Sequence, residues 1–244
     1  MAWRVGGRRG ALVILLSTII GVAITAALGV WQLNRAAQKQ ALQQMLDARS
    51  TMPELPAASL ASTVADAAAQ HFRRVRLKGR WVAAATLFLD NRQMHGRPGF
   101  FVVTPLRLEG SGDAVLVQRG WAPRDFTDRS HVPDVPTPTG TVELVGHIAP
   151  PPARLYEFAG PASGPIRQNV DLDSYSREAG VPLKPLSVMQ DGAAADNLLR
   201  EWPRPAVDVH KHYGYAFQWF ALCALMAGLY VWFQLVRPRL RHRA

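Results

Sequence analysis

The sequence predicts a membrane protein in which two transmembrane α-helices flank one exported α+β domain, rich in antiparallel strands and folded as a small sheet or barrel. Three observations support this prediction. Two runs of more than 20 residues carry no charge, and the segment between them contains short β-rich runs. The surplus of basic residues lies in the two short tails.

The first uncharged run, residues 11–33, predicts a transmembrane helix. Its 23 residues would extend about 34 Å as a helix, against a hydrocarbon core of roughly 30 Å. The alternative is a cleaved signal peptide, because Arg4, Arg8 and Arg9 precede the run. However, the apolar region of a signal peptide is shorter, about 7–15 residues. The run also includes Trp31 and is followed by an amphipathic segment, which predicts that the helix continues beyond the membrane.

The second uncharged run, residues 213–236, has 24 residues and predicts a second transmembrane helix. Both runs contain small residues at helical spacing, which lets two helices approach closely. We expect the two spans to pack against each other, with a helix of a partner protein as the alternative contact. The small residues are Gly21, Thr25 and Gly29 in the first run and Ala224 and Gly228 in the second.

The net charge of +10 predicts the orientation of the chain. Residues 1–10 and 237–244 hold seven of the 28 Lys and Arg residues and no acidic residue, whereas residues 34–212 hold the other 21 and all 18 acidic residues. Because basic flanks mark the cytoplasmic side of a membrane helix, we expect both termini in the cytoplasm. No nucleic-acid partner is expected, because the sequence has no basic stripe with interleaved aromatic residues.

Residues 34–212 predict the exported domain. The helical pattern of the first span continues past residue 34 and ends before Pro53. Residues 172–179 predict a short helix with Asp171 as its N-cap and Gly180 at its end. Strands are predicted at residues 72–82, 85–91, 100–109, 114–122, 141–148 and 186–190.

The common signatures of enzymes and protein metal sites are missing from the sequence. The single cysteine, Cys223, excludes an intrachain disulfide and a CxxC site. No HExxH, GxxxxGK[ST] or GxSxG motif occurs. We therefore do not expect an enzyme, and an envelope enzyme tethered by two helices is the least favoured alternative.

Four stretches resemble one known family. They are GVWQLNRAAQK at residues 29–39, GRPGFFVVTPL at 96–106, VLVQRGWAP at 115–123 and HYGYAFQWF at 212–220. In their order, spacing and architecture they are similar to the surfeit locus protein 1 family of cytochrome c oxidase assembly factors, and the resemblance covers residues 11–237. The family usually has Asn where this chain has Lys211, and often where it has Gln118.

The resemblance implies a membrane-bound accessory factor that binds haem a and aids its insertion into subunit I of the oxidase. It implies subunit I as a partner, with an enzyme of haem a synthesis as a second candidate. The alternative function is a haem-independent membrane scaffold that stabilises an oxidase assembly intermediate. The expected location is the bacterial inner membrane with the main domain in the periplasm, because the ten-residue N-terminal tail is too short for a mitochondrial transit peptide.

By motif position, the resemblance implies that His212 binds the haem. A neutral imidazole nitrogen is a common axial ligand of haem iron, and no other metal ion is expected. Tyr215 and Trp219 follow His212 at i+3 and i+7, and predict an aromatic platform for the macrocycle on the same helix face. The alternative is that His212 contacts lipid headgroups and the two aromatic residues anchor the helix.

Three further residues are candidates for docking or for contact with haem propionates. Arg119 and Trp121 are expected near a strand end, and Arg35 where the first helix leaves the membrane. The alternatives are that Trp121 fills the sheet, that Arg119 faces solvent and that Arg35 anchors the helix at the membrane interface.

Overall fold

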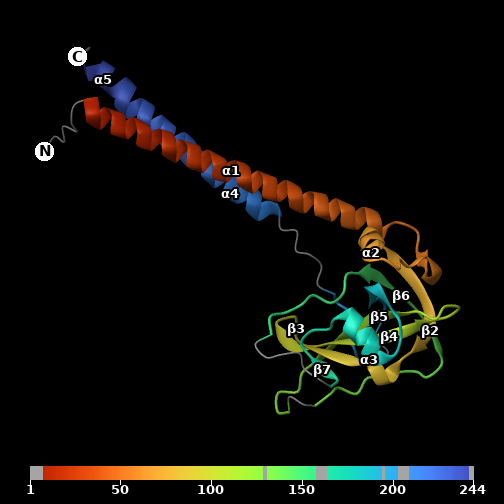
Figure 1. Cartoon of the computed structure of the whole chain (residues 1–244). Helices are drawn as coiled ribbons and strands as arrows, with labels where there is room; N and C mark the ends of the chain where they lie inside the picture. Colours follow the sequence, from red (N-terminus) through yellow and green to blue (C-terminus); the bar gives the residue numbers. More distant parts are fainter. Residues whose placement is uncertain (1–7, 129–130, 158–163, 194–195, 203–208, 242–244) are drawn as a thin grey trace. The chain divides into compact units, whose positions relative to one another are not determined.

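The computed structural model of the chain describes residues 8–128, 131–157, 164–193, 196–202 and 209–241. The chain divides into two compact units (Figure 1). A helical unit is formed by the two ends of the chain, and a sheet domain is formed by Leu46–Arg204. Each unit is described separately below.

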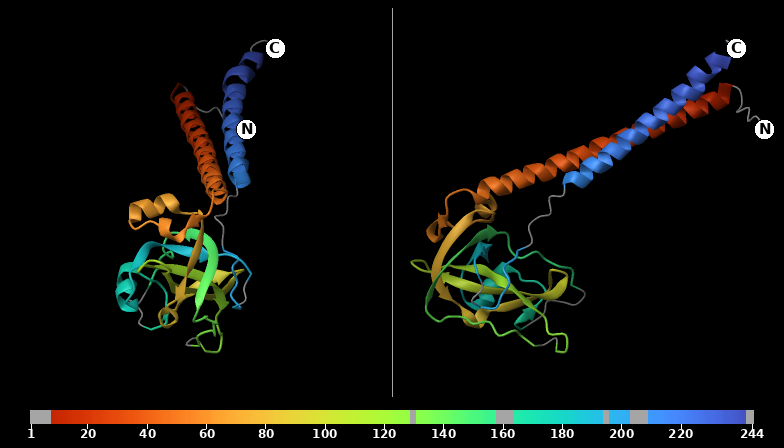
Figure 2. Two further views of the ribbon diagram at one scale, coloured as in Figure 1. Left: turned by 90° about the vertical axis from the view of Figure 1, so that its right-hand side faces the viewer. Right: turned by 180° about the vertical axis from the view of Figure 1, so that it is seen from behind.

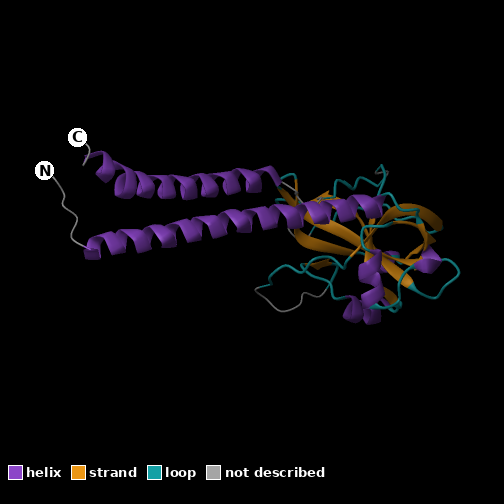
Figure 3. Ribbon diagram, turned by 90° about the horizontal axis from the view of Figure 1, so that it is seen from above, coloured by secondary structure: helices purple, strands orange, loops and turns teal. Residues whose placement is uncertain are grey.

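The helical unit contains two long helices that lie side by side (Figure 3). The first is α1 (Arg8–Ser50), whose last turn belongs to the sheet domain. The second runs through α4 (Val209–Tyr230), a π-helical stretch η3 (Val231–Val236) and α5 (Arg237–Arg241). Both are long and apolar enough to cross a membrane, by length and composition. Many of their large apolar side chains are exposed, which leaves an extensive apolar surface around the pair.

The two helices pack against each other as the sequence predicts, but α4 contributes different residues. A Cβ atom on Gly29 would come within 2.7 Å of the ring of Phe220, and one on Gly21 within 3.2 Å of Met226 Sδ. In contrast, Ala224 is exposed, and no atom of the described residues lies within 4 Å of a Cβ on Gly228. The small residues of α1 therefore receive large side chains of α4, and the predicted contribution of Ala224 and Gly228 is wrong.

The described part of the sheet domain contains one eight-stranded sheet, and five of its strands form a closed ring (Figure 2). The order is β1-β2-β6-β8-β5-β4-β3-β7, and β2 also pairs with β4, which closes the ring β2-β6-β8-β5-β4. The strands are β1 (Leu55–Pro56), β2 (Arg74–Trp81), β3 (Leu87–Met94), β4 (Arg97–Leu108), β5 (Ala114–Pro123), β6 (Thr141–Ala149), β7 (Ile166–Arg167) and β8 (Leu183–Gln190).

The sheet is mixed rather than purely antiparallel. β5 and β8 run parallel, as do the short pairs β1–β2 and β3–β7, whereas the other pairings are antiparallel. The six predicted strands are all present, and β8 begins at Leu183 rather than Leu186. The two-residue strands β1 and β7 were not predicted, because they are too short to show an alternating pattern.

Apolar side chains from all five strands of the ring form one core cluster. Alternate residues of each strand contribute because successive side chains point to opposite faces of a sheet. Burial of each such side chain stabilises the fold by roughly 1.5–3 kcal/mol. The cluster includes Val75 and Leu77 of β2, Leu106 of β4, Val115 and Val117 of β5, Ile148 of β6, and Leu186 and Val188 of β8.

Short helices cover parts of the sheet. α3 (Leu172–Ala179) buries Tyr175 in a second apolar cluster with residues of β3, β4 and β5. Asp171 accepts a hydrogen bond from Ser174 N at 3.0 Å, and Gly180 ends the helix with a φ of 64°, as predicted. The remaining short helices are η1 (Ala57–Ser59), α2 (Val64–Gln70) and η2 (Ala83–Ala85).

Candidate functional site

The two motifs of the sheet domain meet at a β-bulge between β4 and β5. Val102 pairs with Gly120, but the next residue, Val103, pairs with Gln118. Arg119 is therefore the extra residue of the bulge, and a bulge changes the direction of the side chain that it carries.

Trp121, two residues after the bulge, is 1% exposed, and its Nε1 donates to Arg92 O at 2.8 Å. Two neighbouring positions require glycine. A Cβ on Gly99 would lie 2.5 Å from the indole ring of Trp121, and a Cβ on Gly120 would lie 2.6 Å from Leu198 Cβ. Gly99 thus permits close packing on the indole ring, and Gly120 permits the close approach of the segment that contains Leu198.

Arg119 is only 2% exposed and is held inside the sheet domain. Its guanidinium donates to Thr137 Oγ1 and to Pro136 O, both at 2.7 Å, and lies 4.9 Å from the centre of the Trp81 ring. Burial lowers the pKa of Arg119, and the nearby Asp196 carboxylate opposes this shift. The bulge therefore places a buried cation against an aromatic face and a loop.

Arg119 and Arg200 share the carboxylate of Asp196. Asp196 Oδ2 lies 3.3 Å from Arg119 and 2.6 Å from Arg200, and Arg200 also donates to Arg119 O at 2.7 Å. These contacts join the bulge to the segment at residues 196–200. The alternative that Trp121 fills the sheet agrees with its burial, and the alternative that Arg119 faces solvent is wrong. The docking or propionate contact of Arg119 and Trp121 remains a prediction.

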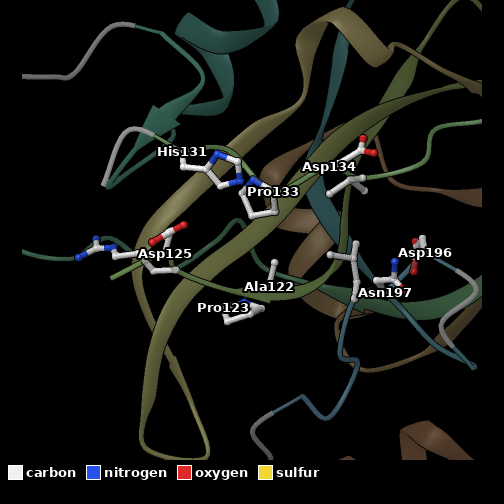
Figure 4. A pocket seen from close by; sticks show the side chains of 11 residues that line it. Ala122, Pro123, Asp125, His131, Pro133, Asp134, Asp196 and Asn197 are labelled. Carbon is white, nitrogen blue, oxygen red and sulfur yellow. The ribbon is translucent and has the colours of Figure 1, made fainter. Parts of the chain in front are cut away.

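A cavity of about 380 Å³ lies next to this network (Figure 4). Two of the three acidic side chains that line it, Asp125 and Asp196, have partners within the domain. Asp125 accepts from both the backbone N and Oγ1 of Thr127, and these hydrogen bonds lower the pKa of its carboxyl group, while Asp196 pairs with the two arginines. We therefore assign no ligand to this cavity. The side chains labelled in Figure 4 are Ala122, Pro123, Asp125, His131, Pro133, Asp134, Asp196 and Asn197.

A second cavity, of about 510 Å³, is lined by residues of η2, β3, α3 and the segment before β7. Tyr175 lies at its wall, donates its hydroxyl to Ala85 O, and has its pKa raised by burial. Both cavities are thus lined by sheet-domain residues and contain none of the residues predicted to bind haem.

In the helical unit, His212 in the first turn of α4 bonds to Gln32 of α1. Nδ1 of His212 lies 2.7 Å from Oε1 of Gln32. An amide oxygen can only accept, so Nδ1 is the donor of this hydrogen bond, and a neutral imidazole that donates through Nδ1 has its lone pair on Nε2. Among the described residues, no hydrogen bond to His212 Nε2 is present. The half-buried imidazole therefore has a nitrogen with the chemistry of a metal ligand.

The other predicted residues of this region lie on the same two helices. Tyr215 is 52% exposed and Trp219 is half-buried, whereas Ala216 between them is buried in the helix pair. Arg35 is exposed on α1 and donates to Gln38 Oε1 at 3.1 Å. The haem platform at Tyr215 and Trp219 and the propionate contact at Arg35 remain predictions.

Gln32 is the residue of this site that sequence reasoning missed. It follows Gly29 by three positions and so continues the stripe of small residues that packs on α4. A polar side chain on such a stripe needs a partner on the facing helix. The position of Gln32 in the sequence therefore indicates a polar contact with the second helix. The sequence alone does not identify the partner, which is 180 positions away.

Comparison with known proteins finds the same family in the family-model match and in the names of the relatives. The model of the SURF1 family matches residues 19–224. A SURF1-like protein of Rickettsia bellii (strain RML369-C) is 25% identical over 223 residues, 88% of each chain. Surfeit locus protein 1 of Takifugu rubripes is 25% identical over 238 residues, 86% of this chain and 92% of the relative. The cytochrome oxidase assembly protein SHY1 of Saccharomyces cerevisiae is 29% identical over 99 residues, 40% of this chain and 25% of the relative.

Proposed function

The chain belongs to the SURF1 family, and on this premise we propose that it is a cytochrome c oxidase assembly factor that binds haem a and aids its insertion into oxidase subunit I. The name of the yeast relative describes an assembly protein for this oxidase. We assign the chain no catalytic reaction. Its partners are subunit I and, as a second candidate, an enzyme of haem a synthesis.

The proposed location is the bacterial inner membrane, with both termini in the cytoplasm and the sheet domain in the periplasm. Two helices of sufficient length and apolar composition support the membrane location. The arginine-rich tails support the orientation. The Rickettsia relative is bacterial and is matched over 88% of its length, which supports a bacterial setting.

The observation that carries the haem proposal is the hydrogen bond between His212 and Gln32. It leaves Nε2 of a neutral His212 with a free lone pair, and this nitrogen would bind the haem iron. The exposed ring of Tyr215 and the half-buried ring of Trp219 add aromatic surface to the same helix. When bound, haem a would supply the iron that accepts this nitrogen.

Haem content of the purified protein tests the assignment of His212. The protein is produced in cells that make haem a, and Soret absorbance per protein is compared between wild type, His212→Ala and His210→Ala. His210 is a matched control because it is an exposed histidine in the same turn of α4. We expect His212→Ala to lose most of the bound haem and His210→Ala to retain it. Equal haem content in wild type and His212→Ala contradicts the assignment.

A second experiment separates the proposal from a haem-independent scaffold. The protein is isolated from cells with and without haem a synthesis, and co-purified subunit I is measured. We expect the association to weaken when haem a is absent, because in this proposal haem a is a ligand of both the chain and subunit I. Unchanged association would favour a scaffold that acts by protein contact alone.

A further inference from the structure

We infer that Gln32 is a positioning residue, which sets the tautomer of His212 and thereby makes its Nε2 atom the metal-binding nitrogen. The part of this inference that concerns the tautomer does not depend on whether the chain binds haem. The part that concerns haem rests on the proposed function.

The geometry of the helix pair supports this role. Gln32 and His212 lie on different helices, and their contact of 2.7 Å is short for a bond between a ring nitrogen and an amide oxygen. The packing next to it is tight, because Gly29, one turn earlier on α1, lies directly against the ring of Phe220. Ala36, one turn later on α1, is fully buried. Gln32 is therefore flanked on its own helix by two closely packed positions, which limits its movement.

The hydrogen bond between Gln32 and Nδ1 of His212 affects the protonation of the other ring nitrogen, Nε2. A neutral imidazole has one protonated and one unprotonated nitrogen, and the hydrogen bond made by one determines the state of the other. Metal-ligating histidines commonly donate their second N–H to an oxygen acceptor, which orients the ring and makes the ligating nitrogen more basic. Gln32 supplies such an acceptor from the neighbouring helix.

A purely structural bond between the helices is the competing explanation, and the chain provides a control for it. Tyr213, next to His212, donates its hydroxyl to Gln40 Oε1 at 3.4 Å. The Gln40→Leu variant therefore removes a glutamine contact between the same two helices without touching the imidazole. Gln32→Leu removes the acceptor for Nδ1, whereas Gln32→Glu retains an oxygen acceptor at the same position.

Nitrogen NMR of the haem-free full chain in detergent micelles tests the tautomer. The histidines are labelled with ¹⁵N, the His212 signals are assigned by their loss in His212→Gln, and spectra are recorded at about pH 8.5, where histidine side chains are ordinarily neutral. We expect Nε2 of His212 to be unprotonated in wild type, Gln40→Leu and Gln32→Glu, and to gain proton occupancy in Gln32→Leu. A protonated Nε2 in wild type overturns the inference without use of any variant. So does a Gln32→Leu spectrum identical to that of wild type.

Titration of the same proteins with haem a extracted from a purified oxidase tests the consequence for binding. We expect Gln32→Leu to weaken the affinity by at least about tenfold, as is typical when the partner of a metal-ligating histidine is removed. Gln32→Glu and Gln40→Leu should bind as wild type does. If His212→Ala loses haem but Gln32→Leu binds normally, Gln32 has no positioning role and the proposed function stands. If His212→Ala binds normally, the assignment of the ligand fails, while the NMR result still decides the tautomer.

Discussion

Arg119 illustrates how one residue connects distant parts of the sheet domain. Its position in the bulge turns the guanidinium toward Pro136, Thr137 and Asp196, none of which belongs to β5. Arg200 lies against the same carboxylate. The carboxylate of Asp196 is therefore important for stability, because its loss would leave the buried guanidinium groups of Arg119 and Arg200 without their counter-ion.

Substitution of Asp196 by Asn tests this arrangement. Breaking a buried ion pair by removing one partner costs about 3 kcal/mol or more, and we expect Asp196→Asn to lower the free energy of unfolding by about that amount. Asp134→Asn, an exposed change in the wall of the same cavity, should stay within about 0.5 kcal/mol of wild type. Urea unfolding followed by tryptophan fluorescence measures both. Equal effects of the two changes would refute the special role of Asp196.

His71 is predicted to make the sheet domain sensitive to acid. Burial and the charge of Arg49, whose guanidinium donates to His71 O at 3.0 Å, lower the pKa of His71 from its usual value. Because the unfolded chain binds the proton more readily than the folded one, stability is fully present above about pH 6.5 and falls as the pH is lowered below it. Unfolding of wild type and His71→Gln at several pH values between about 5 and 8 measures this.

When the pH is lowered from about 7.5 to about 5, we expect the free energy of unfolding to fall more for wild type than for His71→Gln. His131→Gln changes an exposed histidine and should keep the wild-type slope. Identical slopes for wild type and His71→Gln would show that His71 does not contribute.

At the scale of elements, glycines control how closely neighbours approach. In the sheet domain, Gly99 and Gly120 accommodate Trp121 and the segment at residues 196–200. In the helical unit, Gly29 accommodates Phe220. The same requirement thus recurs in a strand pair and in a helix pair, because in both cases a methyl group would overlap a neighbouring ring or backbone.

The helix pair is tested by adding a single methyl group. Gly29→Ala places a Cβ about 2.7 Å from the Phe220 ring, and we expect a loss of roughly 1–3 kcal/mol from overpacking. Gly228→Ala adds the same methyl group at a position where none of the residues described by the structure comes within 4 Å. The stability of this variant should be unchanged or slightly raised by the better helix propensity of alanine. Thermal unfolding in detergent micelles compares the two. A Gly29→Ala protein as stable as Gly228→Ala would contradict the packing.

At the scale of the whole molecule, charge and apolar surface are divided between the two units. The helical unit contains the two apolar helices and the tail arginines. The sheet domain contains the ion pairs Arg74–Glu54, Lys78–Glu109 and Arg167–Glu178. This division accounts for the net charge of +10, since the tails contribute seven of the ten charges. It also agrees with the orientation that we propose in the membrane.

Cysteine labelling tests this orientation. Cys223 is the chain's single cysteine, so Cys223→Ser provides a background without thiols. Ser111→Cys then places a thiol at an exposed turn of the sheet domain, and Arg239→Cys places one on the exposed surface of α5. In intact spheroplasts, a membrane-impermeant maleimide should label Ser111→Cys directly and Arg239→Cys only after lysis. The reverse pattern would contradict a periplasmic sheet domain.

Local features of the fold were predictable from the sequence because they depend on neighbouring residues. The Asp171 cap and the Gly180 end of α3 follow from side-chain and backbone preferences within one turn. The two long helices follow from continuous apolar composition. The strands follow from β-rich runs between Gly and Pro residues, although their partners do not.

The sequence by itself determined the two apolar helices, the sheet-rich domain between them and the motifs of the family. Only the tertiary structure decided that β2 closes a ring with β4, that Arg119 is buried in a bulge and that Gln32 faces His212. Each of these three results depends on which distant segments lie next to each other. Local periodicity specifies which face of an element is buried but does not specify the element that covers it, because that choice depends on the packing of the whole chain.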